Sequence, residues 1–314
     1  MITARGLTRD FVARGSTVAA VRGVDLDVAA GELVGFLGPN GAGKTTTLRM
    51  LTTLLTPTSG EAFVAGADLL TDPAGVRARI GYVGQGNGGG MDQKVGDELV
   101  LHSRLYGLSA PDAKQRAQEM AETFELTDLL GRLVITLSGG QKRRLDIALG
   151  VLHRPSLVFL DEPSTGLDPQ SRDNLWRHIR ELRDAHGATV FLTTHYLDEA
   201  DALCDRIIII DNGRIVAEGT PDELKSRVAG DLVELGVSDP DRAVALAGAV
   251  SGATELDTTA DTVTFRVPRG DTVLPGLLRE LDRAQVRVDA VATHRPTLDD
   301  VFLGLTGRSL REAA

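Results

Sequence analysis

The chain has 314 residues, of which 42% are hydrophobic and 25% charged, and its formal net charge is −10 at pH 7. Because a single hydrophobic core stops growing at about 250–300 residues, this length predicts two domains. The acidic charge argues against a general nucleic-acid binder and against a polybasic surface for anionic lipid. The one cysteine, Cys204, excludes an intramolecular disulfide and a cysteine-based zinc cluster, and we interpret it as a packing residue.

We expect no membrane-spanning segment, because the apolar runs are much shorter than the ~20 residues that a bilayer requires. The segment from Met1 to Val12 lacks the apolar stretch of a secretory signal. These features predict a soluble, cytosolic chain. If it is found at a membrane, a partner protein is expected to hold it there.

Residues 1–220 alternate short apolar strands with glycine-rich turns and helical stretches, which is typical of an α/β fold. The predicted strands are Glu32–Leu37, Leu157–Asp161, Thr189–Thr193 and Arg206–Ile210. Between about residues 86 and 154 the spacing of apolar residues becomes helical, with helices predicted over Asp112–Leu126 and Gln141–Leu152. We interpret this stretch as a helical subdomain inserted into the α/β core.

A glycine-rich segment matches the phosphate-loop pattern G-x-x-x-x-G-K-S/T and precedes a helix predicted over Lys44–Leu55. It consists of Gly38, Pro39, Asn40, Gly41, Ala42, Gly43, Lys44 and Thr45. Its glycines and the helix N-terminus would bring backbone N–H groups to phosphate oxygens. The alternative interpretation of this segment is an ordinary strand–turn–helix that needs glycine only for its backbone geometry. We predict a nucleoside triphosphate site with Lys44 at the β- and γ-phosphates, Thr45 at Mg²⁺ and Thr46 near the α-phosphate.

Polar residues follow two other predicted strands. The strand over Leu157–Asp161 ends in Asp161 and Glu162, at the edge of the sheet where α/β proteins bind ligands. Asp161 is a candidate Mg²⁺ ligand, and Glu162 is a candidate general base for the attacking water. A helix cap would also explain this pair of acids. His195 follows the second strand and is a candidate for sensing the γ-phosphate, although a single histidine is often structural.

A second candidate anion site begins the helix predicted at Gln141. It consists of Ser138, Gly139, Gly140 and Gln141 after Leu137. A serine cap followed by two glycines could present free N–H groups at the helix N-terminus, or could be a plain cap. Its position between the phosphate loop and the carboxylate strand favours a functional role.

With these motifs in this order, residues 1–220 resemble the ABC ATPase family. The matching segments are Gly38–Thr46, Gln85, Leu137–Gln141, Asp161–Glu162, Ser164–Asp168 and His195. The resemblance implies a P-loop NTPase core with a helical subdomain, and ATP and Mg²⁺ as ligands. It also implies that Phe11 stacks on adenine, that Gln85 contacts Mg²⁺ and the attacking water, and that Asp168 belongs to the nucleotide site.

The resemblance further implies a homodimer that forms with ATP. In the family, the signature of one subunit covers the γ-phosphate bound by the other, in an isologous arrangement. ATP favours the closed dimer, hydrolysis releases it, and the helical subdomain passes the motion to a separate membrane permease. After Gln85, the residues Gly86-Asn87-Gly88-Gly89-Gly90 depart from the family pattern, so the sequence does not show how firmly this loop is held.

Residues 221–314 form the second predicted domain. Its strand and helix pattern has the order βαββαβ, which predicts a small ferredoxin-like α+β unit followed by a helix over Thr297–Leu305. That helix has an apolar face made of Leu298, Val301, Phe302 and Leu305. The segment from Arg295 to Gly307 resembles the C-terminal signature of daunorubicin/doxorubicin-resistance ATPases, which implies export of a drug or another hydrophobic metabolite.

Other functions stay open from the sequence alone. A soluble ABC-type ATPase acting on nucleic acid or the ribosome would carry tandem ATPase domains or added modules, which this chain lacks. A regulator that binds nucleotide without hydrolysis is disfavoured because Asp161, Glu162 and His195 are all present. An importer, or an exporter of lipid or polysaccharide, is a further alternative. The transported substrate does not follow from the sequence.

Overall fold

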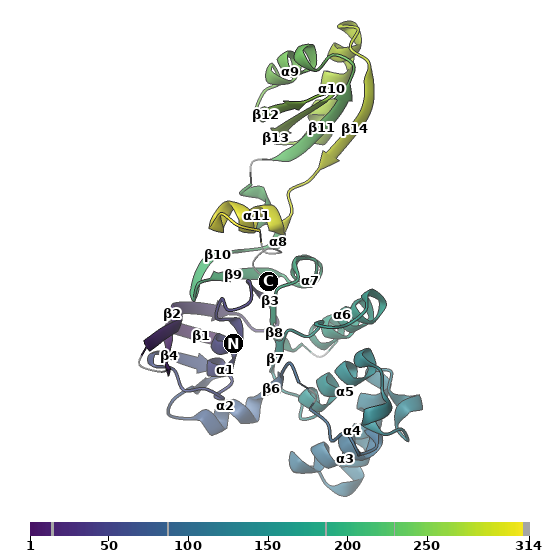
Figure 1. The fold of residues 1–314 in the computed structure, drawn as a ribbon. Helices are drawn as coiled ribbons and strands as arrows, with labels where there is room; N and C mark the ends of the chain where they lie inside the picture. The colour runs from purple at the N-terminus through teal and green to yellow at the C-terminus, as the bar shows by residue number, and fades with distance from the viewer. Residues whose placement is uncertain (14–15, 87, 186, 229, 310–314) are drawn as a thin grey trace. The chain divides into compact units, whose positions relative to one another are not determined.

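The structure, a computed structural model, describes residues 1–13, 16–86, 88–185, 187–228 and 230–309. It divides into two compact units, of which the first is Met1–Thr220 and the second begins at Pro221 (Figure 1). In these described ranges, no helix combines the length and the apolar character needed to cross a bilayer.

The first unit is built around a six-stranded sheet with the order β10-β9-β3-β8-β7-β6. Its strands are β3 (Leu33–Leu37), β6 (Ile80–Val83), β7 (Leu157–Asp161), β8 (Thr189–Thr194), β9 (Arg206–Asp211) and β10 (Arg214–Gly219). All neighbours pair in parallel except β9 and β10, which form a hairpin across Asn212 and Gly213. Every residue of β3, β7 and β8 is buried, which explains why β3 and the first four residues of β7 appear as continuous apolar runs.

A second, antiparallel sheet with the order β2-β1-β4-β5 packs against the first through a shared apolar core. Its strands are β1 (Ile2–Ala13), β2 (Ser16–Val28), β4 (Ser59–Val64) and β5 (Ala67–Asp68). Leu7 and Val24 from this sheet share the core with Phe36, Phe159 and Phe191 from the central sheet. Through this core, β3, the strand before the phosphate loop, also packs against the antiparallel sheet.

Helices account for the rest of the first unit. They are α1 (Lys44–Leu51), α2 (Pro73–Arg79), α3 (Val95–Leu105), α4 (Ala110–Thr123), α5 (Gly139–Val151), α6 (Pro169–Asp184) and α7 (Leu197–Leu203). The helices α3, α4 and α5 lie between β6 and β7 in the chain, which confirms the predicted helical insertion. Short 3-10 turns at Thr127–Leu129 and Val134–Thr136 connect α4 to α5.

The second unit has the element order βαββαβ and the strand order β12-β13-β11-β14, with every neighbouring pair antiparallel. Its elements are α8 (Pro221–Ser226), β11 (Asp231–Val237), α9 (Pro240–Gly248), β12 (Thr254–Thr259), β13 (Thr262–Val267), α10 (Gly270–Arg283), β14 (Val288–His294) and α11 (Leu298–Thr306). This is the ferredoxin-like arrangement expected from the sequence. Alternate residues of β11 and β13 are buried under α9 and α10.

Two predicted helices end earlier in the structure, and one residue of a predicted apolar helix face is exposed. Helix α1 ends at Leu51 rather than Leu55, because Thr53 has a left-handed backbone with φ of 63° that a helix cannot continue. Helix α4 ends at Thr123 because Glu125, with φ of 52°, turns the chain in the same way. In α11 three of the four predicted apolar residues are buried, but Leu305 in the last turn is 43% exposed.

Glu125 joins the helical insertion to α6. Its carboxylate accepts hydrogen bonds from Arg144 on α5 at 2.8 Å, and from Asn174 and Arg177 on α6 at 3.2 and 2.9 Å. The contact with Arg177 and then that with Asn174 lower the pKa of Glu125 to about 2. Because the side chain is 45% exposed, solvent screens these contacts and the stabilisation is small, about 1 kcal/mol or less.

We expect the variant Glu125→Gln to be slightly less stable than the parent at pH 7. The pKa of Glu125 in the folded state, about 2, lies below its ordinary value of 4.5, so the unfolded chain binds more protons between these values. The stability difference should therefore be present above pH ~4.5 and disappear as the pH falls toward ~2. Urea unfolding midpoints measured across this range test it.

The matched control is Glu61→Gln, which removes one exposed carboxylate from β4. A Glu125→Gln difference that persists unchanged at low pH would contradict the assignment of this stabilisation to the ionised carboxylate.

Candidate functional site

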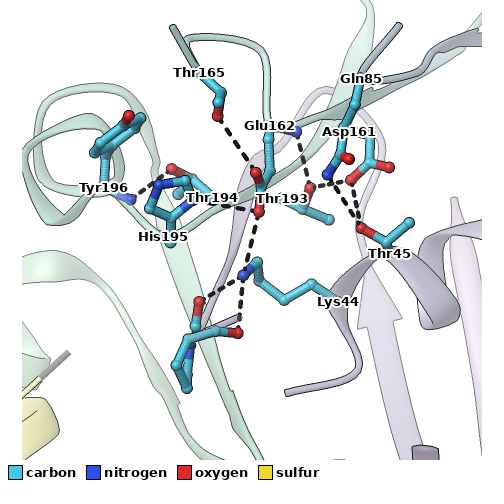
Figure 2. Close-up of polar contacts among 12 residues, drawn as sticks. Lys44, Thr45, Gln85, Asp161, Glu162, Thr165, Thr193, Thr194, His195 and Tyr196 are labelled. Atoms are coloured by element: carbon cyan, nitrogen blue, oxygen red, sulfur yellow. Dashed lines mark hydrogen bonds and ion pairs between the residues drawn. The ribbon is translucent and has the colours of Figure 1, made fainter. Parts of the chain in front are cut away.

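The parallel register of the central sheet brings three loops to one edge. Leu37 at the end of β3 pairs with Thr194 of β8, and Asp161 at the end of β7 pairs with Thr193. The phosphate loop, Glu162 and His195 follow these strands directly, so their side chains converge (Figure 2). This is the carboxyl edge where ligands bind in open α/β sheets.

The phosphate loop wraps the N-terminus of α1. Gly43 is the N-cap with φ of 106°, and a Cβ there would lie 2.7 Å from the carbonyl oxygen of Ala20, so the position requires glycine. A Cβ on Gly38 would lie 2.3 Å from the carbonyl oxygen of Ile210. Ala42 is buried in the core.

The loop borders a cavity of about 380 Å³. The lining residues are Ala20, Pro39, Asn40, Gly41, Gly43, Lys44, Thr45, Thr46, Gln85 and Glu162. The helix N-terminus, a lysine and backbone N–H groups therefore face one hollow, which has the chemistry of a phosphate site.

Lys44 lies at the floor of the site and is 4% exposed. Its Nζ donates hydrogen bonds to the carbonyl oxygens of Gly38 at 2.7 Å and Pro39 at 3.1 Å, and lies 3.4 Å from Glu162 Oε1. Burial lowers the pKa of this ammonium group, and the Glu162 carboxylate opposes that effect. The site therefore holds a buried cation that an anionic ligand could neutralise.

Glu162 lies between Lys44 and His195, whose Nδ1 is 3.3 Å from the same carboxylate oxygen (Figure 2). Contact with the His195 imidazole lowers the pKa of Glu162, and the charge of Lys44 adds to this against the cost of burial. The carboxylate is thus kept ionised and able to accept a proton. Thr165 Oγ1 also donates to it at 3.3 Å.

The backbone of Glu162 is strained, with φ of 46°. Its N–H donates to the carbonyl oxygen of Thr193 at 3.1 Å and to Thr193 Oγ1 at 3.0 Å. These contacts with the neighbouring strand hold the residue in a conformation that non-glycine residues seldom adopt.

Oxygen atoms suited to a hard cation gather beside the phosphate loop. Thr45 Oγ1 lies 3.1 Å from Asp161 Oδ1, and the amide nitrogen Nε2 of Gln85 lies 3.5 Å from the same hydroxyl, with the amide oxygen on the same side-chain group. Asp161 is 1% exposed. Because Mg²⁺ prefers carboxylate, hydroxyl and carbonyl oxygens, these three predicted ligands fit it.

Gly139 of the signature segment lines a second cavity, which shares Gln85 and Glu162 with the first. Ser138 is the N-cap of α5 and forms a capping box with Gln141. The second cavity, of about 230 Å³, is lined by Gln85, Gly139, Lys142, Arg143, Asp146, Glu162, Thr165, Gly166 and Leu167. Gly140 faces Ser171, and a Cβ there would lie 2.8 Å from the serine Oγ.

Two predicted nucleotide contacts lie apart from the phosphate-loop cavity. Phe11 on β1 is 38% exposed, with the guanidinium of Arg9 4.9 Å from its ring centre. Asp168 is the N-cap of α6 and accepts hydrogen bonds from the N–H and hydroxyl of Ser171. Their roles in binding adenine and nucleotide stay predictions.

Sequence reasoning missed Thr193, a buried residue whose Oγ1 donates to Asp161 Oδ1 at 2.7 Å. The signal was the pair of threonines, Thr193 and Thr194, that ends a fully buried strand directly before His195. It also missed Glu199 on α7, a buried carboxylate that accepts hydrogen bonds from Ser164 and Trp176. Burial raises the pKa of Glu199. Ser164 lies two residues after Glu162, so this cluster joins the loop after β7 to α6 and α7.

Comparison with known proteins identified two family models. Residues 21–165 match the model described as ABC transporter, and residues 219–306 match the model described as ATP-binding protein DrrA1-3-like, C-terminal domain. The chain is 46% identical over 308 residues to the daunorubicin/doxorubicin resistance ATP-binding protein of Streptomyces peucetius, covering 94% of this chain and 92% of that one.

Two further similarities follow. The linearmycin resistance ATP-binding protein of Bacillus subtilis is 36% identical over 297 residues, covering 93% of this chain and 95% of that one. A solved dimeric ATP-binding cassette, in a post-hydrolysis state with ADP and Pi, is 25% identical with a TM-score of 0.65. It covers 70% of this chain and 98% of its own.

We expect Thr193→Val to lower the free energy of unfolding by about 1–3 kcal/mol, because the buried Asp161 carboxylate loses a donor and Glu162 N–H loses an acceptor. Thr47→Val is the matched control: Thr47 is also buried, but within the described part of the chain its hydroxyl has no hydrogen-bond partner. Chemical denaturation of both variants measures the difference. Equal losses in the two variants would show that the Thr193 hydroxyl does not support the site.

Proposed function

The chain belongs to the family of ABC transporter ATP-binding proteins, and we propose that it energises export of a drug or similar hydrophobic metabolite through a separate permease. The observation that carries this proposal is the convergence of Lys44, Glu162 and His195 at the phosphate-loop cavity. Members of this family bind and hydrolyse ATP, and the chain is an ATPase. The export direction is supported by the resistance-protein relatives and by the C-terminal match over residues 219–306.

Each residue of the site has a defined task in this proposal. The loop N–H groups and the Lys44 ammonium bind the phosphates, and Lys44 exchanges its contacts with Gly38 and Pro39 for phosphate oxygens. Glu162, ionised by its surroundings, accepts the proton of the attacking water, and His195 holds that carboxylate and meets the γ-phosphate.

Thr45, Asp161 and Gln85 would hold Mg²⁺, which supplies neutralisation of phosphate charge when it is bound. Thr193 orients Asp161 by its hydrogen bond at 2.7 Å. Burial of Asp161 keeps solvent from competing for the carboxylate oxygens.

We also propose that the active form is a dimer of two copies closed by ATP. No residue of the signature segment Leu137–Gln141, which the structure describes in full, lines the phosphate-loop cavity of its own chain, so its helix N-terminus is left to cover a phosphate of a second copy. The similar solved cassette is described as dimeric. In this arrangement each ATP is bound between the phosphate loop of one copy and the signature of the other.

The permease would hold the ATPase at the cytoplasmic face of the membrane. The nature of the cargo is a property of that partner in this proposal, since the two named relatives confer resistance to different compounds. A pull-down of the neighbouring membrane protein, followed by transport in inverted vesicles, tests export directly. If the substrate instead accumulates in right-side-out vesicles and not in inverted ones, the chain belongs to an importer.

We expect Glu162→Gln to lower the rate of ATP hydrolysis by about 10²–10⁴-fold, because the attacking water loses its proton acceptor. The variant should still bind ATP, since Lys44 and the loop are unchanged. It should therefore accumulate as a dimer when ATP and Mg²⁺ are added, as measured by size-exclusion chromatography with light scattering.

The control is Glu122→Gln, which changes an exposed carboxylate on α4 and should retain the parent rate. Undiminished hydrolysis by Glu162→Gln would remove Glu162 from the role of general base. A variant that hydrolyses no ATP and also stays monomeric with ATP would instead contradict the dimer.

A further inference from the structure

Arg143 lies in the second turn of the signature helix α5, and each of its three guanidinium nitrogens donates a hydrogen bond to a backbone carbonyl oxygen. Its Nε donates to Pro163 at 2.8 Å, its Nη1 to Gly84 at 2.6 Å and its Nη2 to Asp161 at 3.1 Å. The residue is 8% exposed. A buried cation with this many main-chain partners is expensive to replace, because its loss leaves buried acceptors unpaired.

The three carbonyls belong to the two catalytic loops. Asp161 and Pro163 flank Glu162, so Arg143 binds the carbonyl oxygen of the residue before and of the residue after the strained position. Gly84 directly precedes Gln85, the predicted contact for Mg²⁺ and the attacking water. One side chain therefore fixes the start of the Gln85 loop relative to the catalytic carboxylate.

Asp146, three residues further along α5, provides a second tether. Its Oδ1 accepts a hydrogen bond from the N–H of Gly88 at 2.7 Å. Arg143 and Asp146 both line the 230 Å³ cavity together with Gln85 and Glu162. The loop around Gln85 is thus attached to α5 on both sides, at Gly84 and at Gly88, although its glycine-rich sequence alone permits great freedom.

Geometry explains why arginine is needed here. A guanidinium presents several N–H groups in a planar fork, whereas a lysine ammonium is a compact point charge. The carbonyls of Pro163, Gly84 and Asp161 take hydrogen bonds from three different nitrogens of the fork. The carboxylates of Asp146 and Asp161 oppose the lowering of the Arg143 pKa that burial causes.

We propose that Arg143 is a positioning residue that couples the signature helix to catalysis by holding Glu162 and the Gln85 loop in register. The same helix begins at the signature, so a shift of its N-terminus on nucleotide contact is passed through Arg143 to the backbone on both sides of Glu162. This proposal rests on the proposed ATPase function, and it adds a route by which the helical subdomain controls hydrolysis.

The experiment measures kcat, KM and ATP affinity for the full chain with Arg143→Met, Arg143→Lys and the control Arg144→Met. Arg144 is the next residue of α5, and its guanidinium forms an ion pair with Glu125 instead of contacting a catalytic loop. We expect Arg143→Met to lower kcat by about 10²-fold with ATP affinity unchanged, since a misplacement of about 1 Å has this effect. The kcat of Arg143→Lys should lie between those of Arg143→Met and the parent. Arg144→Met should retain the parent kcat.

A second measurement separates positioning from folding. Arg143→Ala leaves a guanidinium-sized space, so millimolar guanidinium chloride should raise kcat while equal sodium chloride does not. In the Glu162→Gln background, Arg143→Met should cause no further loss of the residual rate, because both changes act on one step. Thermal unfolding of each variant reports the folded fraction.

The proposal is overturned if Arg143→Met keeps the parent kcat per folded molecule, or if its loss equals that of Arg144→Met. An added loss in the Glu162→Gln background, without rescue by guanidinium, also overturns it. These outcomes differ from a failure of the proposed function, in which the parent chain itself would hydrolyse no ATP and the Arg143 variants would differ from it in stability only.

Discussion

The left-handed backbone of Glu162 is the constraint on which the rest of the site depends. The residue follows a fully buried strand and must turn sharply to direct its carboxylate toward Lys44 and His195. A conformation of this kind costs of order 1–3 kcal/mol in a non-glycine residue and persists only when its surroundings hold it. Thr193 holds the N–H from one side, and Arg143 holds the two flanking carbonyls from the other.

The strained residue Glu162 forms an ion pair with Lys44. Lys44 and Glu162 are both poorly exposed, and Lys44 Nζ lies 3.4 Å from Glu162 Oε1, so each charge is compensated by the other. Entry of a polyphosphate would supply Lys44 with a new anionic partner and release the glutamate for a water molecule. The ion pair thereby links substrate binding to the availability of the base, as expected when two buried charges stabilise each other.

The helical insertion matters because α5 carries three functions along one short stretch. Its N-terminus carries the signature segment, its second turn binds the loops that contain Glu162 and Gln85 through Arg143, and Asp146 accepts a hydrogen bond from Gly88 in the glycine-rich segment. Glu125 attaches the same insertion to α6 with exposed ion pairs that solvent screens. Strong buried contacts thus face the catalytic loops, and weaker exposed ones face the remaining helices.

The sequence determined the α/β order, the phosphate loop, the acidic pair after β7 and the ferredoxin-like pattern of the second unit, because each depends on local periodicity or on glycine at fixed spacing. Tertiary structure decided the contacts among residues distant in the chain. Thr193 supports Asp161 across 32 positions and Arg143 reaches Gly84 across 59, and neither pairing has a local signal. Only the parallel register of β3, β8 and β7 and the placement of α5 bring these groups within hydrogen-bond distance.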